Sequence, residues 1–258
     1  MLLHGWPQHW WSWRRVLPAL AAGRRVLCPD LRGLGWSDAP RGAYAKEEWA
    51  SDVIALLDAL GLERVDLAGH DWGGLVALLV ALRAPERLAS VTAMSIVHPW
   101  PRPPRPSPAA LLPLAYQGPL ATPVLGERLL RHVPDVVREL IRRGSHRSAR
   151  WTGAELDTYA RVLREPARAR ASSAMYRTFL LREAGALASG RYAGARLRVP
   201  ALMLTGAADA VVGPPALAGL DEHADEARTV VVERAGHFVP EERPDVVLAE
   251  LEAHLRAG

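Results

Sequence analysis

The sequence contains little cysteine, little lysine and no long hydrophobic run, and each shortage argues against a class of protein. A single cysteine, Cys28, makes an internal disulfide impossible and is compatible with a reducing cytoplasm, where we expect the protein to reside. No apolar segment approaches the roughly 18 residues that are needed to cross a bilayer. We therefore expect no membrane span.

Positive charge is present but is not concentrated in one patch. The 32 basic residues exceed the 28 acidic residues, which gives a formal net charge of +4 at pH 7. Lys46 is the only lysine, and the arginines are spread along the chain, with those at 161–170 best explained by a solvated helix face. Nucleic-acid binding would require an aromatic platform or a recognised module. The sequence offers neither, so we expect no nucleic-acid partner.

Short apolar segments alternate with amphipathic ones, a rhythm typical of a parallel sheet that is covered by helices on both faces. With 258 residues, 49% of them hydrophobic, the chain can bury a sizeable core within one α/β domain. The pattern predicts strands at residues 25–28, 65–68, 91–97, 201–204 and 229–232, and helices at 46–60, 74–82 and 244–255.

The rhythm stops at the proline-rich segment 98–108, which can be neither a helix nor a central strand because proline removes backbone donors. We interpret it as a linker into a helical insertion, with helices at 127–132, 134–143, 155–163 and 166–182. The chain then divides into a first core part (1–97), a helical lid (98–192) and a second core part (193–258). Such a lid would exclude water from an apolar substrate cavity.

The segment 69–73, Gly-His-Asp-Trp-Gly, has the form of a G-x-S-x-G nucleophile elbow with aspartate in place of serine. It lies between the predicted strand 65–68 and the predicted helix 74–82, which is the order that the motif requires. Gly69 and Gly73 allow the sharp turn that would lift Asp71 into a site. A carboxylate there can attack a saturated carbon and form an ester. The alternative is an ordinary acidic residue in a strand-to-helix loop.

A carboxylate nucleophile needs a base that activates water and an acid that orients the base. His237 follows the predicted strand 229–232, and Asp209 lies in a glycine-rich turn after the strand 201–204. The order nucleophile, acid, histidine is that of the α/β-hydrolase fold. Taken alone, His237 could be a surface histidine and Asp209 only a turn residue.

Two backbone N–H groups are candidates for an oxyanion hole. One belongs to Trp72, directly after the candidate nucleophile, and the other to Trp6 in the segment His-Gly-Trp-Pro at 4–7. The segment 4–7 could also simply start a helix, with Pro7 setting the backbone. Both interpretations are compatible, because a donor aimed into a site needs a rigid loop.

Four segments together resemble the epoxide hydrolase branch of the α/β-hydrolase fold superfamily. They are the stretch 4–14, the stretch 29–38 (Pro-Asp-Leu-Arg-Gly-Leu-Gly-Trp-Ser-Asp), the elbow, and Gly-His-Phe at 236–238. The resemblance covers nearly the whole chain. It implies an α/β-hydrolase fold with a mostly parallel sheet flanked by helices and an inserted helical lid, and it implies no metal and no organic cofactor.

Epoxide hydrolases of this type carry two lid tyrosines that hydrogen-bond the epoxide oxygen. Tyr176, in Ala-Met-Tyr-Arg, is similar to the tyrosine on the last lid helix, and Tyr116 is similar to the earlier one. The alternative for each is a packed side chain with its hydroxyl in solvent. Tyr159 and Tyr192 are interpreted as packing residues. The resemblance implies that the substrate site is lined by Trp6, Trp72, Tyr116, Tyr176 and Phe238.

The expected reaction opens a small apolar epoxide with water to a vicinal diol through an ester on Asp71. Haloalkane dehalogenation is the alternative, because the indole of Trp72 could donate to a departing halide. Haloalkane dehalogenases, however, resemble a His-Gly-Asn-Pro pattern with a second halide donor where this chain has Trp6. Fluoroacetate dehalogenases carry arginine after the aspartate. A catalytically silent binding protein and a homo-oligomer both remain possible.

The start of the chain departs from the family pattern. The fold normally has two strands before the oxyanion-loop strand, and only residues 1–3 precede the loop here. Either the first strands are missing or the recorded start lies inside a longer gene product. We expect an uncovered sheet edge near 25–28, and with it low solubility or strand pairing between molecules.

Overall fold

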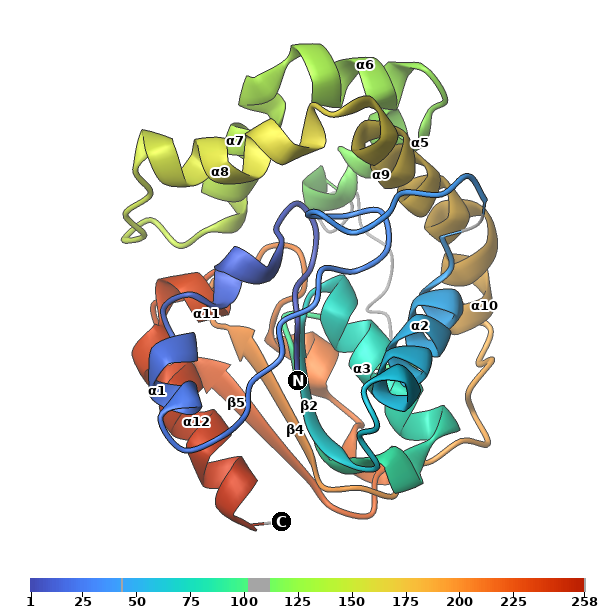
Figure 1. The fold of residues 1–258 in the computed structure, drawn as a ribbon, viewed down its shortest axis with the longest axis vertical. Helices are drawn as coiled ribbons and strands as arrows, with labels where there is room; N and C mark the ends of the chain where they lie inside the picture. The colour runs from blue at the N-terminus through green and yellow to red at the C-terminus, as the bar shows by residue number, and fades with distance from the viewer. Residues whose placement is uncertain (43, 102–111, 258) are drawn as a thin grey trace.

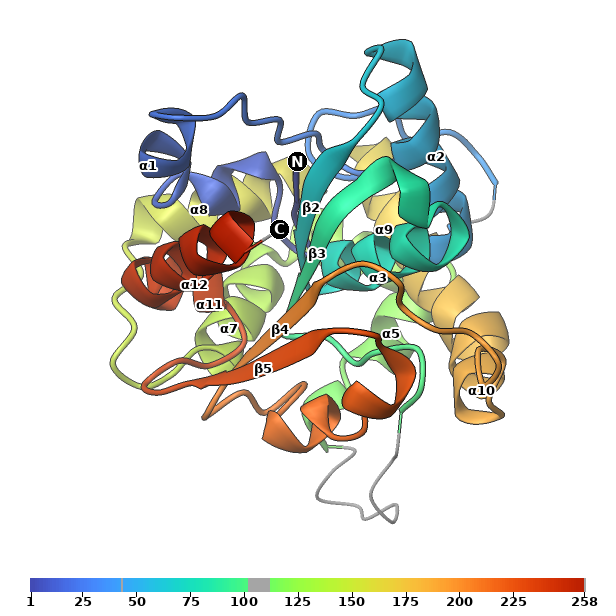
Figure 2. The ribbon, with the colours of Figure 1, turned by 90° about the horizontal axis from the view of Figure 1, so that it is seen from below.

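The computed structural model describes residues 1–42, 44–101 and 112–257, and its centre is a parallel sheet. The five described strands pair in chain order (Figures 1 and 2). They are β1 (Leu2–Leu3), β2 (Val65–His70), β3 (Leu88–Met94), β4 (Ala201–Gly206) and β5 (Ala227–Val232). Parallel pairing places all carboxyl ends at one edge of the sheet, and β2 ends there directly before Asp71.

Helices cover both faces of the sheet, as the alternating sequence pattern predicts. Helices α2 (Lys46–Ala59) and α3 (Trp72–Arg83) pack together on one face, and α1 (Leu17–Ala21), α11 (Val239–Glu242) and α12 (Pro244–Ala257) lie on the other (Figure 2). Adjacent strand residues point to opposite faces. Leu67 accordingly joins the core under α2 and α3, and Ala68 joins the core under α12.

A layer of helices lies beyond the carboxyl ends of the strands (Figure 1), and we call it the upper layer. It consists of α5 (Gln117–Ala121), α6 (Leu125–His132), α7 (Pro134–Gly144), α8 (Gly153–Leu163), α9 (Pro166–Thr178), a π-helical turn (Phe179–Glu183) and α10 (Ala184–Ala188). Helix α8 begins with a capping box between Thr152 and Glu155, and α9 begins with proline at its first position. No strand occurs in the described stretch 112–192.

Short 3₁₀ turns complete the described elements, and no helix among them is long and apolar enough to cross a bilayer. The 3₁₀ turns are Trp10–Trp13, Pro85–Arg87, Leu112–Leu114, Pro214–Leu217 and Asp221–His223. Of the expected proline-rich linker, residues 98–101 belong to no helix or strand, and 102–108 lie outside the described residues.

Two predicted elements are wrong in detail. Residues 25–28 form no strand, although Leu27 accepts a hydrogen bond from the N–H of Leu2 at 2.8 Å. This bond joins 25–28 to β1, but it is not repeated along the segment as a ladder would require. The predicted helix 166–182 breaks after Thr178 into the π turn, which carries one more residue per hydrogen-bonded turn than an α-helix. That turn brings Phe179 and Glu183 against the core.

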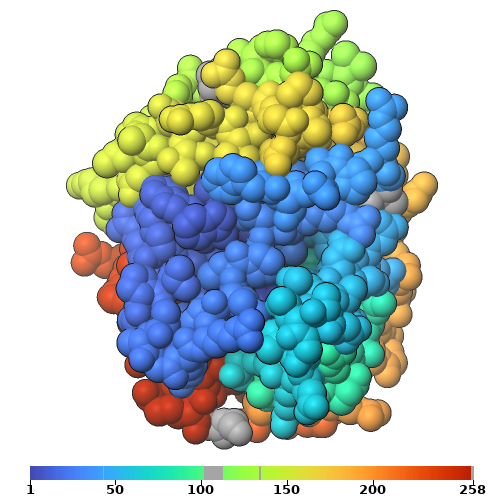
Figure 3. Space-filling view, in the orientation of Figure 1, coloured from blue at the N-terminus to red at the C-terminus, as the bar shows by residue number. Residues whose placement is uncertain are grey.

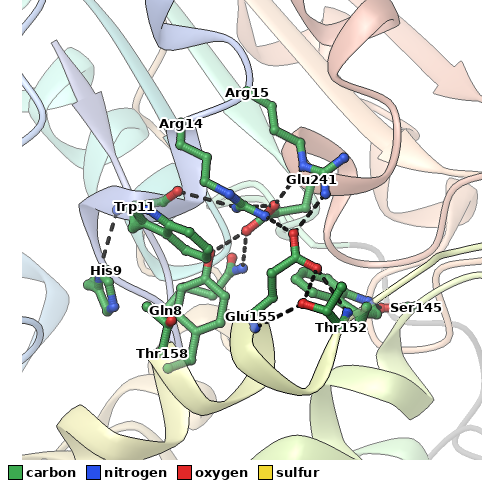
Figure 4. A network of polar contacts seen from close by, with 12 residues as sticks. Gln8, His9, Trp11, Arg14, Arg15, Ser145, Thr152, Glu155, Thr158 and Glu241 are labelled. Atoms are coloured by element: carbon green, nitrogen blue, oxygen red, sulfur yellow. Dashed lines mark hydrogen bonds and ion pairs between the residues drawn. The ribbon is translucent and has the colours of Figure 1, made fainter.

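A polar network joins α8 of the upper layer to the core (Figure 4). The buried carboxylate of Glu241, in α11, accepts hydrogen bonds from the Tyr159 hydroxyl and from Arg14. Arg14 and Arg15 also bind Glu155 of α8, at 2.6 and 2.9 Å. In Figure 3 the upper layer meets the N-terminal segment directly across this face. Side chains from both ends of the chain therefore hold the upper layer at this side.

Candidate active site

Asp71 occupies a sharp turn between β2 and α3. Its φ of 50° and ψ of −127° lie where residues other than glycine are rarely found, and such strain concentrates at functional positions. A Cβ on Gly69 would lie 2.1 Å from the carbonyl oxygen of Gly73, and a Cβ on Gly73 would lie 2.4 Å from that of His4. The two glycines of the motif therefore allow the strand, the helix and the N-terminal loop to approach one another.

The structure brings Asp71, His237 and Asp209 together in a buried chain of contacts. His237 Nε2 lies 3.3 Å from Asp71 Oδ2, and His237 Nδ1 lies 3.0 Å from Asp209 Oδ2. The other oxygen of Asp209 accepts the backbone N–H groups of Val211 and Val212, at 2.8 and 2.9 Å. These bonds fix the Asp209 carboxylate, which in turn orients the imidazole.

The two carboxylates control the charge of His237. Burial alone would lower the pKa of His237, but Asp209 and Asp71 outweigh it and raise that pKa to about 10. Burial would raise the pKa of Asp209, yet His237 and the two backbone donors lower it. As long as Asp71 carries no ester, the imidazole is therefore protonated at neutral pH.

Backbone groups on both sides hold the loop that carries His237. The N–H of His237 donates to the carbonyl of Gly144, and Nε2 of His70 donates to the carbonyl of His237, both at 2.7 Å. Burial lowers the pKa of His70 to about 4, so this neighbour stays neutral. Glu242 accepts the N–H groups of Gly236 and Phe238, each at 3.0 Å.

The backbone of Trp6, predicted as an oxyanion donor, faces Asp71. Its backbone N–H lies 2.9 Å from Asp71 Oδ1. A Cβ on Gly5 would lie 2.3 Å from the Cβ of Asp71, so only glycine permits this approach. Trp72 is the first residue of α3, directly after the turn, and the Asp71 side chain does not cap that helix. The Asp71 carboxylate instead faces Trp6 and His237.

Both predicted tyrosines reach the same region from the upper layer. The hydroxyl of Tyr176, on α9, lies 3.4 Å from that of Tyr116, which precedes α5. The ring of Tyr176 packs edge-on against those of Trp6 and Trp72, at centroid distances of 5.1 and 6.2 Å. Burial raises the pKa of Tyr116 to about 12 and holds that of Tyr176 well above its usual value, so both phenols are neutral donors at physiological pH.

A largely apolar cavity of about 510 Å³ opens beside these groups. Its lining includes the predicted residues Trp6, Tyr116, His237 and Phe238. Pro7, Pro113, Ala115, Leu140, Arg143, Gly144, Ala210 and Val211 complete it. Another cavity of about 380 Å³, between β2 and α12, contains none of the predicted site residues.

Comparison with known proteins agrees with this geometry. Residues 1–244 match the family model described as the alpha/beta hydrolase fold. The chain belongs to the α/β-hydrolase fold family. The soluble epoxide hydrolase of Corynebacterium sp. (strain C12) is 30% identical over 264 residues, covering 96% of this hydrolase and 86% of that protein. Epoxide hydrolase B of Mycobacterium tuberculosis is 46% identical over 99 residues, covering 37% of this chain and 28% of that one.

Solved structures give the same result for the whole fold. Epoxide hydrolase CorEH has a TM-score of 0.86 and 28% identity, covering 99% of this chain and 90% of its own. Cfl2 from Burkholderia cenocepacia has a TM-score of 0.84 and 28% identity, covering 98% and 86%. This protein is thus a hydrolase of the epoxide hydrolase branch, and the expected fold class is confirmed.

Three contacts of this hydrolase escaped the sequence analysis. The indole N–H of Trp6 donates to Ser172 Oγ at 3.1 Å, and no motif marked that serine. Tyr159, interpreted as packing, donates a hydrogen bond to Glu241, and Tyr192 donates one to Glu47. Each pair is separated by more than 80 residues, so local patterns carry no signal for it.

Proposed function

We propose that this hydrolase opens epoxides to vicinal diols in two steps, through an ester on Asp71. The observation that carries the proposal is the environment of this one carboxylate. One oxygen accepts the N–H of Trp6, and the other faces His237. The neutral phenols of Tyr176 and Tyr116 lie near it; Tyr116 lines the apolar cavity, and the Tyr176 hydroxyl lies 3.4 Å from that of Tyr116.

In the first step an oxygen of Asp71 bonds to an epoxide carbon while the carbon–oxygen bond of the ring breaks. The ring oxygen leaves as an alkoxide and takes a proton from Tyr176 or Tyr116. The proton on the resting imidazole of His237 then restores that phenol, which leaves His237 neutral for the second step. Closure beneath the upper layer, which we propose to be the lid spanning 98–192 between core parts 1–97 and 193–258, keeps competing water out. Positioning of this kind accounts for much of the acceleration in bimolecular steps.

In the second step water attacks the ester carbonyl of Asp71. His237, oriented by Asp209, takes a proton from that water, and the Trp6 and Trp72 N–H groups hold the oxyanion. The carbon–oxygen bond to the substrate then breaks, the diol leaves and the carboxylate is restored. A base of this kind typically contributes about 10² to 10⁴ in rate, and one oxyanion donor contributes roughly 10² to 10³.

The ester is the decisive species. In a His237→Gln variant the first step should proceed and the second should stall, so intact-mass analysis should find an adduct that maps to Asp71. In wild-type protein under single turnover, heavy-oxygen water should label the protein before any label reaches the diol. Direct delivery of solvent oxygen to the first product would contradict the two-step scheme.

The tyrosines separate epoxide opening from dehalogenation. An alkoxide needs a proton, whereas a halide leaves without one, so Tyr176→Phe should slow diol formation strongly and leave halide release little changed. Tyr192→Phe, in which the lost hydroxyl binds Glu47, is the matched control. The contact of the Trp6 indole with Ser172 favours the epoxide, because that N–H is already engaged. Halide release faster than diol formation would favour the dehalogenase.

A further inference from the structure

The only lysine of the chain, Lys46, lies over the ring of Trp72. Lys46 is the first residue of α2 and is completely buried. Its Nζ lies 4.3 Å from the centroid of the Trp72 ring, 5.2 Å from that of Phe179 and 5.9 Å from that of Trp49. These three rings form an aromatic cage around the ammonium, an arrangement that attracts a cation to the ring faces.

Glu183 neutralises the ammonium from the upper layer. One oxygen of its carboxylate accepts the Nζ of Lys46 and the other accepts the backbone N–H of Lys46, both at 2.7 Å. Ala45, the cap residue of α2, supplies no side-chain bond, so Glu183 also satisfies one N–H at the positive end of that helix. Burial lowers the pKa of Lys46, and Glu183 and Asp71 oppose that shift.

The segment that holds Lys46 is continuous with the helix that carries Tyr176. Glu183 ends the π turn that follows α9, and Phe179 in the same turn packs edge-on against Trp72 at 4.7 Å. Turns of this kind are frequent at functional sites. The position of Lys46 therefore affects the positions of two groups, the Trp72 ring and the Tyr176 hydroxyl.

The indole N–H of Trp72 is itself available. It is buried and makes no hydrogen bond of acceptable geometry within the described ranges, although it lies near enough to Tyr176 to lower the pKa of that phenol. A cation on the face of an indole draws electron density from the ring and strengthens its N–H as a donor. Lys46 can thus polarise the one free donor that lies next to the Tyr176 hydroxyl.

We propose that Lys46 is a positioning residue for epoxide opening, which fixes and polarises Trp72 and, through Glu183, holds Tyr176 in place. This inference rests on the two-step function proposed above. It assigns Lys46 to the first step alone. Ester hydrolysis depends on His237, Asp209 and Trp6, which the cage does not contact, and on the backbone N–H of Trp72. Lys46 lies over the ring of Trp72, whereas the Trp72 N–H belongs to the turn at the start of α3, which the strained backbone of Asp71 sets.

The test is a single-turnover comparison in which ester formation and ester decay are timed separately by rapid quench and intact mass. Lys46→Met should slow ester formation about tenfold, within the range that misplaced reacting groups produce, and should change ester decay by less than about twofold. Glu183→Gln should act in the same direction, and the double variant should be no slower than Lys46→Met. General destabilisation would lower the rates of both steps or the fraction of active protein. The proposal would be overturned if both rates fell equally or if neither rate changed.

Arg191→Met is the matched control. Arg191 also lies over an aromatic ring, that of Tyr192, and binds a glutamate of α2, Glu47, but its side chain is 53% exposed. Neither step should change in that variant. A loss of ester formation equal to that of Lys46→Met would show that any ion pair at this end of α2 has the same effect.

A second measurement separates failure of the cage from failure of the proposed function. Because Lys46 is the only lysine, an amine-acylating reagent can modify only this side chain and the N-terminus. Peptide mapping should find Lys46 unmodified in native protein and at least about tenfold more reactive in Glu183→Gln, because the desolvated ammonium loses its partner. Rapid acylation of Lys46 in native protein would show that its ammonium is not enclosed and would refute the cage. If Lys46 is not acylated but wild-type protein forms no ester, only the proposed function is refuted.

Discussion

Esterification of Asp71 should change the charge of His237, and this coupling can be measured without substrate. His237 lies between two carboxylates, 3.3 Å from Asp71 and 3.0 Å from Asp209, and its pKa is raised to about 10. A protonated imidazole cannot act as a base. The ester would remove the charge of Asp71, and Asp71→Asn removes it in the same way while keeping an acceptor for the Trp6 N–H.

The size of the effect follows from the distance. Two unit charges 3.3 Å apart interact by about 5 kcal/mol at an effective dielectric constant of 20. Because 1.36 kcal/mol corresponds to one pH unit, the interaction is equivalent to at most about 3 to 4 pH units. The titration of His237 in Asp71→Asn should therefore move down by about three pH units, from about 10 toward neutrality.

Histidine NMR titration provides the measurement. The His237 signal is assigned as the one that disappears in His237→Gln. Wild-type His237 should stay protonated up to about pH 9 and titrate near 10, while in Asp71→Asn it should titrate within about one unit of pH 7. His70, which burial keeps neutral, should change in neither protein and serves as the internal control. Equal titration midpoints for His237 in both proteins would refute the electrostatic coupling of the two steps.

Two further predictions concern stability and the shape of the site. Glu241→Ala should lower the free energy of unfolding in urea by about 3 kcal/mol, because a buried carboxylate that binds an arginine and a phenol is lost. The control, Asp245→Ala, removes an exposed carboxylate and should lower it by less than about 1 kcal/mol. Equal losses in the two variants would argue against a stabilising role of the Glu241 network. Gly5→Ala should abolish ester formation, because the added Cβ would overlap Asp71, while Gly185→Ala, which meets nothing within 4 Å, should leave it intact. Retained activity in Gly5→Ala would contradict the close approach of the N-terminal loop to Asp71.

The core of the fold could be predicted because its signals are local. The strand, turn and helix around Asp71 are specified within residues 65–82, by apolar periodicity and by two glycines. The structure has β2 two residues longer than predicted and α3 two residues earlier, and their order is unchanged. The chain order of Asp71, Asp209 and His237 likewise predicted that they lie close together, and His237 does lie within hydrogen-bonding reach of both carboxylates. Their catalytic roles stay predictions until an ester is detected.

Elements that depend on a distant partner were predicted less well. Residues 26–28 form a short apolar run, Val-Leu-Cys, of the kind found in strands, but propensity does not say whether the segment will pair regularly with its neighbour. The same reasoning applies to the π turn. Its form depends on contacts of Phe179 and Glu183 with Trp72 and Lys46, and these partners lie more than 100 residues earlier in the chain.

Composition nevertheless held one signal that motif analysis does not weigh. Of the 32 basic residues, 31 are arginine, so arginine is the default cation of this chain wherever a charge faces solvent. Among the residues that the structure describes, the single lysine is the one basic side chain of lysine or arginine that is completely enclosed, with three rings around it and one carboxylate. A compact ammonium suits such a cage, whereas the broad planar guanidinium has five donors to satisfy. The single lysine thus indicates a packing requirement, and it lies over the ring of Trp72, the residue that follows Asp71.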